Sequence, residues 1–175
     1  MQHDPILDIP AIERFGIDTG IFALMNSKWG WPISEIIHFS GLCMIIMSVG
    51  MFDLRLLGVA KQLPVSAVRR LLPWGVTGFI ICVATGLMFV TGVRANVPSS
   101  PYDVIKSNIW LQMKFVFIGL AGLNLLAFYV TGMNRKVDEL GPGASAPALA
   151  KIIAAASLFF WLGVIYFGRL IPEGL

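Results

Sequence analysis

Four apolar stretches, each about as long as a bilayer is thick, dominate the pattern of hydrophobic and polar positions. A transmembrane helix needs about 20 consecutive, mostly apolar residues. The pattern therefore predicts membrane spans at about residues 33–52, 72–93, 109–131 and 152–171. Because short loops connect these spans, we expect an all-α integral membrane fold, a four-transmembrane-helix bundle, within one domain over residues 31–175.

Residues 1–30 form a separate N-terminal segment in this interpretation. Between residues 11 and 26, apolar side chains such as Phe15 alternate with charged ones such as Arg14 and Asp18. The stretch is too mixed to span a membrane and too apolar for a free tail. We expect an amphipathic helix that lies at the membrane interface.

Composition supports a membrane protein. The chain is 57% hydrophobic and 13% charged, against about 45–50% and 25% in soluble domains. The net charge of +3 comes from cations in loops beside the spans, so the lipid bilayer explains it and no nucleic-acid partner is expected. We find no nucleophile elbow, phosphate loop or zinc-protease motif. An electron carrier or a binding or transport protein is therefore favoured over an enzyme.

The distribution of Lys and Arg predicts the orientation. The first loop carries Arg55, Lys61, Arg69 and Arg70, and the third loop carries Arg135, Lys136 and Lys151. The opposite side carries Arg14, Lys28, Arg94 and Lys106. Seven cations (four plus three) against four place loops one and three in the cytoplasm and both termini outside, by the positive-inside rule.

This orientation places several polar residues at a similar depth. Glu35 and His38 lie inside the first span, and His38 is roughly 7–8 Å below its outer end at 1.5 Å per residue. Lys114 lies about five residues into the third span, Arg169 near the end of the fourth and Arg94 at the outer end of the second. Ionisable residues inside spans are functional candidates. We therefore expect a binding site in the outer leaflet, although Lys114 and Arg169 could also simply extend to the interface.

Helical phase separates two faces of the first span. At 100° per residue, Glu35 shares the face of His38. A methionine stripe points roughly 180–240° away from that face and consists of Met44, Met47 and Met51. We interpret this stripe as a packing surface, within the core or between subunits, and we expect a homo-oligomer.

Haem b is the leading cofactor hypothesis. His38 would be the metal ligand, Gly41 one turn later would leave space for a porphyrin edge, and Arg169, Lys114 or Arg94 would lie near the propionates. The protein would then be a cytochrome-b-like membrane redox or electron-transfer protein that binds haem near the outer face.

The histidine count leaves the second axial ligand open. The only other histidine is His3, in the N-terminal tail. The iron would be five-coordinate, or bound by His3, by a methionine or another side chain, or by a second His38 across an oligomer interface.

Two alternatives need no haem. In a small-solute, anion or proton-coupled transporter, Glu35 and His38 would exchange protons while Lys114 and Arg169 bind an anion. In a structural accessory subunit, the chain would pack against a larger membrane or periplasmic redox complex.

A set of short motifs resembles a known group. The motifs are Glu35-x-x-His38, Asp53-Leu-Arg-Leu-Leu-Gly58, Leu72-Pro-Trp74, Thr85-Gly86, Lys114 in QMKF, Asn124, Trp161 and Gly168-Arg169. Across most of residues 30–170, the chain resembles an uncharacterised family of small bacterial four-span membrane proteins. It is more distantly similar to copper-resistance-D-type and cytochrome b561-like membrane domains. The resemblance implies the bacterial inner membrane and a haem or copper connection, but those domains supply several membrane histidines and this chain supplies one.

Overall fold

Four long apolar helices make up the membrane domain. The computed structural model describes residues 11–92 and 101–174, and every regular element in these ranges is a helix. The helices long and apolar enough to cross a membrane are Gly30–Leu57, Val65–Thr91, Ile109–Val130 and Ala148–Gly174. The predicted all-α four-helix membrane bundle is therefore confirmed.

Each membrane span has its own internal structure. The first consists of α3 (Gly30–Ile45), the π-helix η1 (Ile46–Gly50) and α4 (Met51–Leu57). The second combines α5 (Val65–Arg69) with α6 (Leu72–Thr91), and the third is α8 (Ile109–Val130). The fourth is α10 (Ala148–Leu170), which the 3₁₀-helix η3 (Ile171–Gly174) extends.

The first span is longer than the sequence predicts. We expected it to end near residue 52, before Asp53 and Arg55, but the helix continues to Leu57. Gly58 then ends it with a φ of 101°, the left-handed conformation that glycine adopts most readily. Asp53 and Arg55 are both buried. Their charges therefore do not mark the end of the helix.

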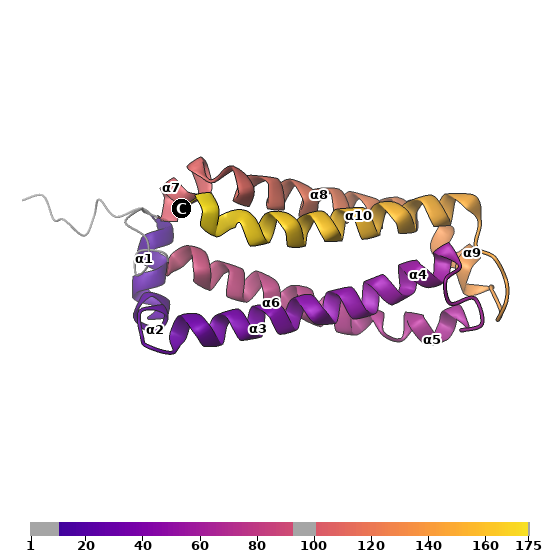
Figure 1. Ribbon diagram of the computed structural model, residues 1–175, viewed down its shortest axis with the longest axis horizontal. Helices are drawn as coiled ribbons and strands as arrows, with labels where there is room; N and C mark the ends of the chain where they lie inside the picture. Colours follow the sequence, from indigo (N-terminus) through magenta and orange to yellow (C-terminus); the bar gives the residue numbers. More distant parts are fainter. Residues whose placement is uncertain (1–10, 93–100, 175) are drawn as a thin grey trace, which may run out of the picture.

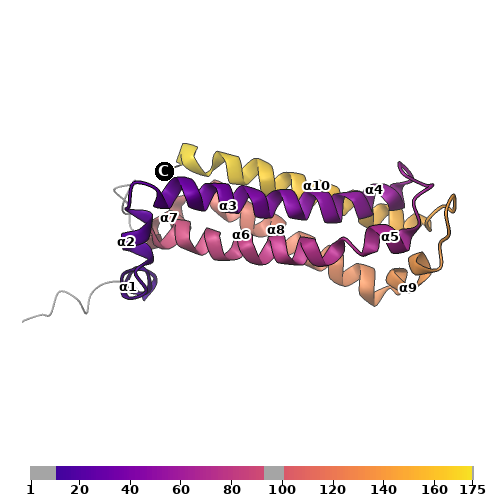
Figure 2. The same cartoon turned by 90° about the horizontal axis from the view of Figure 1, so that it is seen from below.

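The N-terminal segment forms two short helices instead of one. Helix α1 (Ala11–Asp18) and helix α2 (Ile21–Met25) are separated at Gly20, which has a φ of 74°. Both lie across one end of the bundle, close to the C-terminus (Figures 1 and 2). We call this the terminal end. The opposite end, which carries α5 and α9 (Met133–Asp138), is the loop end.

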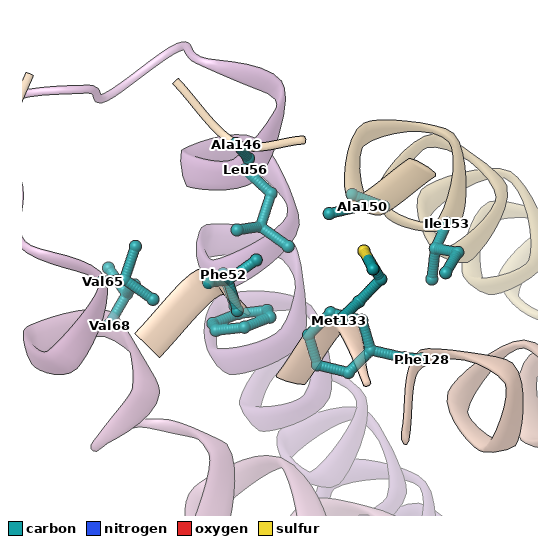
Figure 3. Packing of buried hydrophobic residues seen from close by; sticks show 11 residues of the cluster. Phe52, Leu56, Val65, Val68, Phe128, Met133, Ala146, Ala150 and Ile153 are labelled. Atoms are coloured by element: carbon teal, nitrogen blue, oxygen red, sulfur yellow. The ribbon is translucent and has the colours of Figure 1, made fainter. Parts of the chain in front are cut away.

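The four spans form two helix pairs. Helix α3 packs on α6 and α8 packs on α10, while α4 joins the pairs by packing on α10. Figure 1 shows the pairs as two layers that approach each other toward the loop end. The buried apolar cluster is centred there (Figure 3) and contains Phe52, Leu56, Val65, Val68, Phe128, Met133, Val137, Ala146, Ala150, Ile153 and Ala154. The loop end is therefore the firmly packed part of the bundle.

Glycines bring α3 and α6 into direct backbone contact. A Cβ atom on Gly41 would lie 2.8 Å from the carbonyl oxygen of Gly78, and one on Gly78 would lie 2.5 Å from that of Gly41. Small residues permit such an approach between membrane helices. This contact fixes the face of α3 that points toward α6.

Gly78→Leu is expected to lower the free energy of unfolding by about 1–3 kcal/mol, because the added side chain would push the two backbones apart. The matched control is Gly86→Leu, since Gly86 lies on the same helix with open space beside it. Unfolding in mixed detergent and SDS micelles would measure both variants. Equal effects of the two substitutions would contradict the proposed role of the contact.

Candidate functional site

His38 lies in the interface between α3 and α6. The side chain is buried, and its Nδ1 atom is 2.7 Å from the hydroxyl oxygen of Thr85. The Thr85 hydroxyl donates its single proton to the carbonyl oxygen of Ile81 at 2.7 Å. With that proton directed at Ile81, the Thr85 oxygen accepts a hydrogen bond from the Nδ1–H tautomer of His38. In the neutral ring this leaves the lone pair of Nε2 available to a ligand.

Aromatic rings surround the imidazole. The ring of Phe89 is 5.5 Å from that of His38, and Trp31 is 5.1 Å from Phe89. The thiol of Cys82 donates to the His38 carbonyl oxygen at 3.4 Å. The histidine is thus held on a largely apolar wall, with its position fixed by both helices.

Lys114 belongs to the facing layer. It lies on α8 and is half-buried, with its ammonium 3.5 Å from where a Cβ of Gly168 on α10 would be. It forms no hydrogen bond or ion pair within residues 11–92 and 101–174. His38 on α3 and Cys82 on α6 belong to the opposite layer. An ammonium in this position is costly unless an anionic or polar partner approaches it.

Glu35 does not join this pair. It is exposed on α3, and its Oε1 atom accepts a hydrogen bond from Nε1 of Trp31 at 3.1 Å. Although Glu35 and His38 are three residues apart, the structure records no interaction between them within the described ranges. The expected exchange of a proton between the two side chains has no support in this geometry.

The structure describes only one of the other two cations that we predicted for the site. Arg169 is exposed near the end of α10, one residue beyond the glycine that Lys114 packs against. Arg94 and His3 lie outside the described residues. The structure therefore places His38 and Lys114 on facing layers and leaves Arg169 exposed near the end of α10.

Gly41 has a different environment from the one expected. A Cβ at this position would lie 2.9 Å from the sulfur of Cys82 and 3.0 Å from a methyl carbon of Ile81. The side of α3 on which we expected room for a porphyrin edge is thus covered by α6. Gly41 allows the helices to approach and contributes no open space.

Arg55, which the sequence pattern places in the first loop, is fully buried. Its guanidinium donates to the carbonyl oxygens of Leu63 at 2.5 Å, Ala144 at 3.3 Å and Gly141 at 3.2 Å. These acceptors belong to the loop after α4 and the loop before α10. Arg55 therefore fastens two loops together and is a structural residue at the loop end. No local signal in the sequence points to these distant acceptors.

Asp53 is the other buried charge at the loop end. Its side chain is 5% exposed, and Ser157 on α10 interacts with the carboxyl group. The Oδ2 atom has no hydrogen-bond partner in the part of the chain that the structure describes. Asp53 lies fifteen positions beyond His38 on the same span, about 22 Å away at 1.5 Å per residue, so it does not belong to the His38 site.

Within the described ranges, no group of three or more His, Cys, Asp or Glu side chains gathers that could hold a metal ion. Comparison with known proteins found no matching family model, no matching curated protein and no matching solved structure.

Proposed function

We propose that this multi-pass membrane protein is a cytochrome-b-like redox protein that binds haem b near its terminal end, with Nε2 of His38 as the axial ligand. The observation that carries the proposal is the hydrogen bond from Nδ1–H of His38 to Thr85. Metal-binding histidines almost always donate their second ring N–H in this way, which fixes the tautomer and the ring orientation.

The neighbouring side chains fit the polar and apolar parts of a haem. Lys114 on α8 carries an ammonium group that would compensate the charge of a propionate. Arg169 lies on α10, directly after the glycine against which Lys114 packs. Phe89 and Trp31 offer aromatic contacts. Since α6 covers the Gly41 side, the porphyrin would lie on the side of His38 that faces Lys114. Bound haem supplies one-electron transfer, and the protein residues hold and orient it.

The second axial position is not supplied by another histidine within the described residues. The iron would be five-coordinate, or its second ligand would come from His3 or from a second copy of the chain. The positive-inside rule places the terminal end outside the cytoplasm. Although Arg55 is buried, the remaining six cations of loops one and three (seven minus one) still exceed the four on the opposite side.

Absorption spectroscopy tests the proposal directly. The protein is purified from cells supplied with haem precursor, and the purified protein is also titrated with haem in detergent. We expect a Soret band that saturates at one haem per chain, or at one per two chains if two copies share the iron. Absence of a saturable Soret band in both preparations would contradict the proposal.

Anion transport is the second candidate, because Lys114 has no partner in the described part of the chain. This function requires no pigment. Transport would be supported if the protein carries a small anion into liposomes, if Lys114→Gln abolishes this flux, and if the protein binds no haem. Lys106→Gln is the control, since Lys106 is exposed and lies on the short helix α7 (Pro101–Ser107) before α8.

A further inference from the structure

A groove at the loop end lies far from the His38 site along the spans. It is lined by Arg69 at the end of α5, by Leu72, Pro73 and Val76 in the first turns of α6 and by Tyr129 near the end of α8. It is shallow and open, with a volume of about 440 Å³. The groove therefore combines one cation at the edge of the membrane domain with an apolar wall that continues along the span.

Arg69 keeps hydrogen-bond donors free. Its Nη1 atom donates to the carbonyl oxygen of Asn134 at 3.3 Å and forms an ion pair with Asp138. The Nε and Nη2 atoms form no hydrogen bond within the described ranges. A guanidinium that is held in place on one side and open on the other is suited to bind a phosphate group.

The surrounding charge favours an anionic ligand. The cations Arg69, Arg70, Arg135 and Lys136 and the anions Asp138 and Glu139 lie on α5 and α9 or directly beside them. Four positive and two negative side chains give a local charge of +2. Exposed aromatic side chains at this level, Trp74 and Tyr129, are typical of the boundary between lipid tails and headgroups.

We infer that this groove binds an anionic glycerophospholipid. The lipid phosphate contacts the free side of the Arg69 guanidinium, and one acyl chain lies along Leu72 and Val76 against Tyr129. Basic pockets beside membrane helices recognise anionic headgroups in this way. A free phosphate ion would use Arg69 but would gain nothing from the apolar wall, so the lining favours a lipid over a soluble anion.

Lipid binding to the full-length protein in detergent tests the inference. The probes are phosphatidylglycerol, phosphatidylcholine with the same acyl chains, and inorganic phosphate, and the readouts are native mass spectrometry and the unfolding temperature. We expect phosphatidylglycerol to bind and to raise the unfolding temperature, because a ligand that binds only the folded state stabilises it. Equal effects of the two lipids, or of inorganic phosphate and phosphatidylglycerol, would overturn the inference.

Two charge variants separate lipid binding from the ion pair. Arg69→Gln is expected to weaken phosphatidylglycerol binding about 10-fold or more, because charge-assisted hydrogen bonds to the phosphate are lost. Asp138→Asn breaks the same ion pair but keeps the guanidinium, so binding should be retained or become tighter. If both variants lose binding equally, the groove depends only on the ion pair and the inference is wrong.

The apolar part of the groove has its own test. Val76→Trp fills the groove without changing any charge and should also reduce phosphatidylglycerol binding. Val130→Trp is its control, because Val130 is 76% exposed and is not part of the groove lining. Arg135→Gln controls for general attraction of anionic lipid, and its effect should stay within about 2-fold, the order expected for an exposed charge. The inference would be overturned if Val130→Trp reduced binding as much as Val76→Trp, or if Arg135→Gln reduced it as much as Arg69→Gln.

Discussion

Arg55→Met is expected to lower the free energy of unfolding by about 3–5 kcal/mol, because three hydrogen bonds from a charged group, each worth about 1.5–3 kcal/mol, are lost and part of that loss is offset when water reaches the carbonyl groups. The guanidinium is fully buried and donates to three carbonyl oxygens. Methionine fills a similar volume but donates no hydrogen bond. The carbonyl groups of Leu63, Gly141 and Ala144 would then lose their partner, and the two loops would separate from α4.

Reversible unfolding in mixed detergent and SDS micelles measures this effect. Arg70→Met is the matched control, because Arg70 is exposed and the change should stay within about 0.5 kcal/mol. Arg55→Lys retains the charge, but an ammonium cannot reproduce the planar fork that reaches both loops. It should therefore lie between the wild type and Arg55→Met. A stability of Arg55→Met equal to that of Arg70→Met would refute the proposed fastening of the loops.

The contrast between Arg55 and the long apolar stretches shows what the sequence could predict. Span lengths follow from local composition, and the third span was placed to within one residue of its observed end at Val130. The end of the first span could not be predicted in this way. Arg55 remains inside the helix because carbonyl groups 86 and 89 residues away accept its hydrogen bonds. No local pattern contains that information.

The candidate site could likewise be predicted only in part. Depth along the spans indicated that His38 and Lys114 belong at a similar level, and the structure places them on facing layers. Phase alone could not decide the position of Glu35. The contact between Gly41 and Gly78 determines which face of α3 turns toward α6, and Glu35 remains on the exposed side. Thr85 could be recognised as a partner of His38 only once that contact was known.

His38→Ala is expected to abolish saturable haem binding, because the chain then offers no histidine within the described membrane spans. Thr85→Val should give a graded result. It preserves the shape of the side chain but removes the acceptor for Nδ1–H of His38, and loss of such a partner typically weakens metal binding about 10–100-fold. Thr85→Ser keeps a hydroxyl group and should restore most of the affinity.

The matched control for this series is Thr77→Val. Thr77 lies on the same helix, is exposed, and donates to the carbonyl oxygen of Pro73 at 3.0 Å, so it shares the chemistry of Thr85 without contacting His38. Haem titration gives the affinity of each variant, and the position of the Soret band reports the ligand field at the iron. A purely structural role of Thr85 would change stability without moving the band. If His38→Ala bound haem with the wild-type spectrum, another side chain would be the ligand, and the site between α3, α6 and α8 would need a different function.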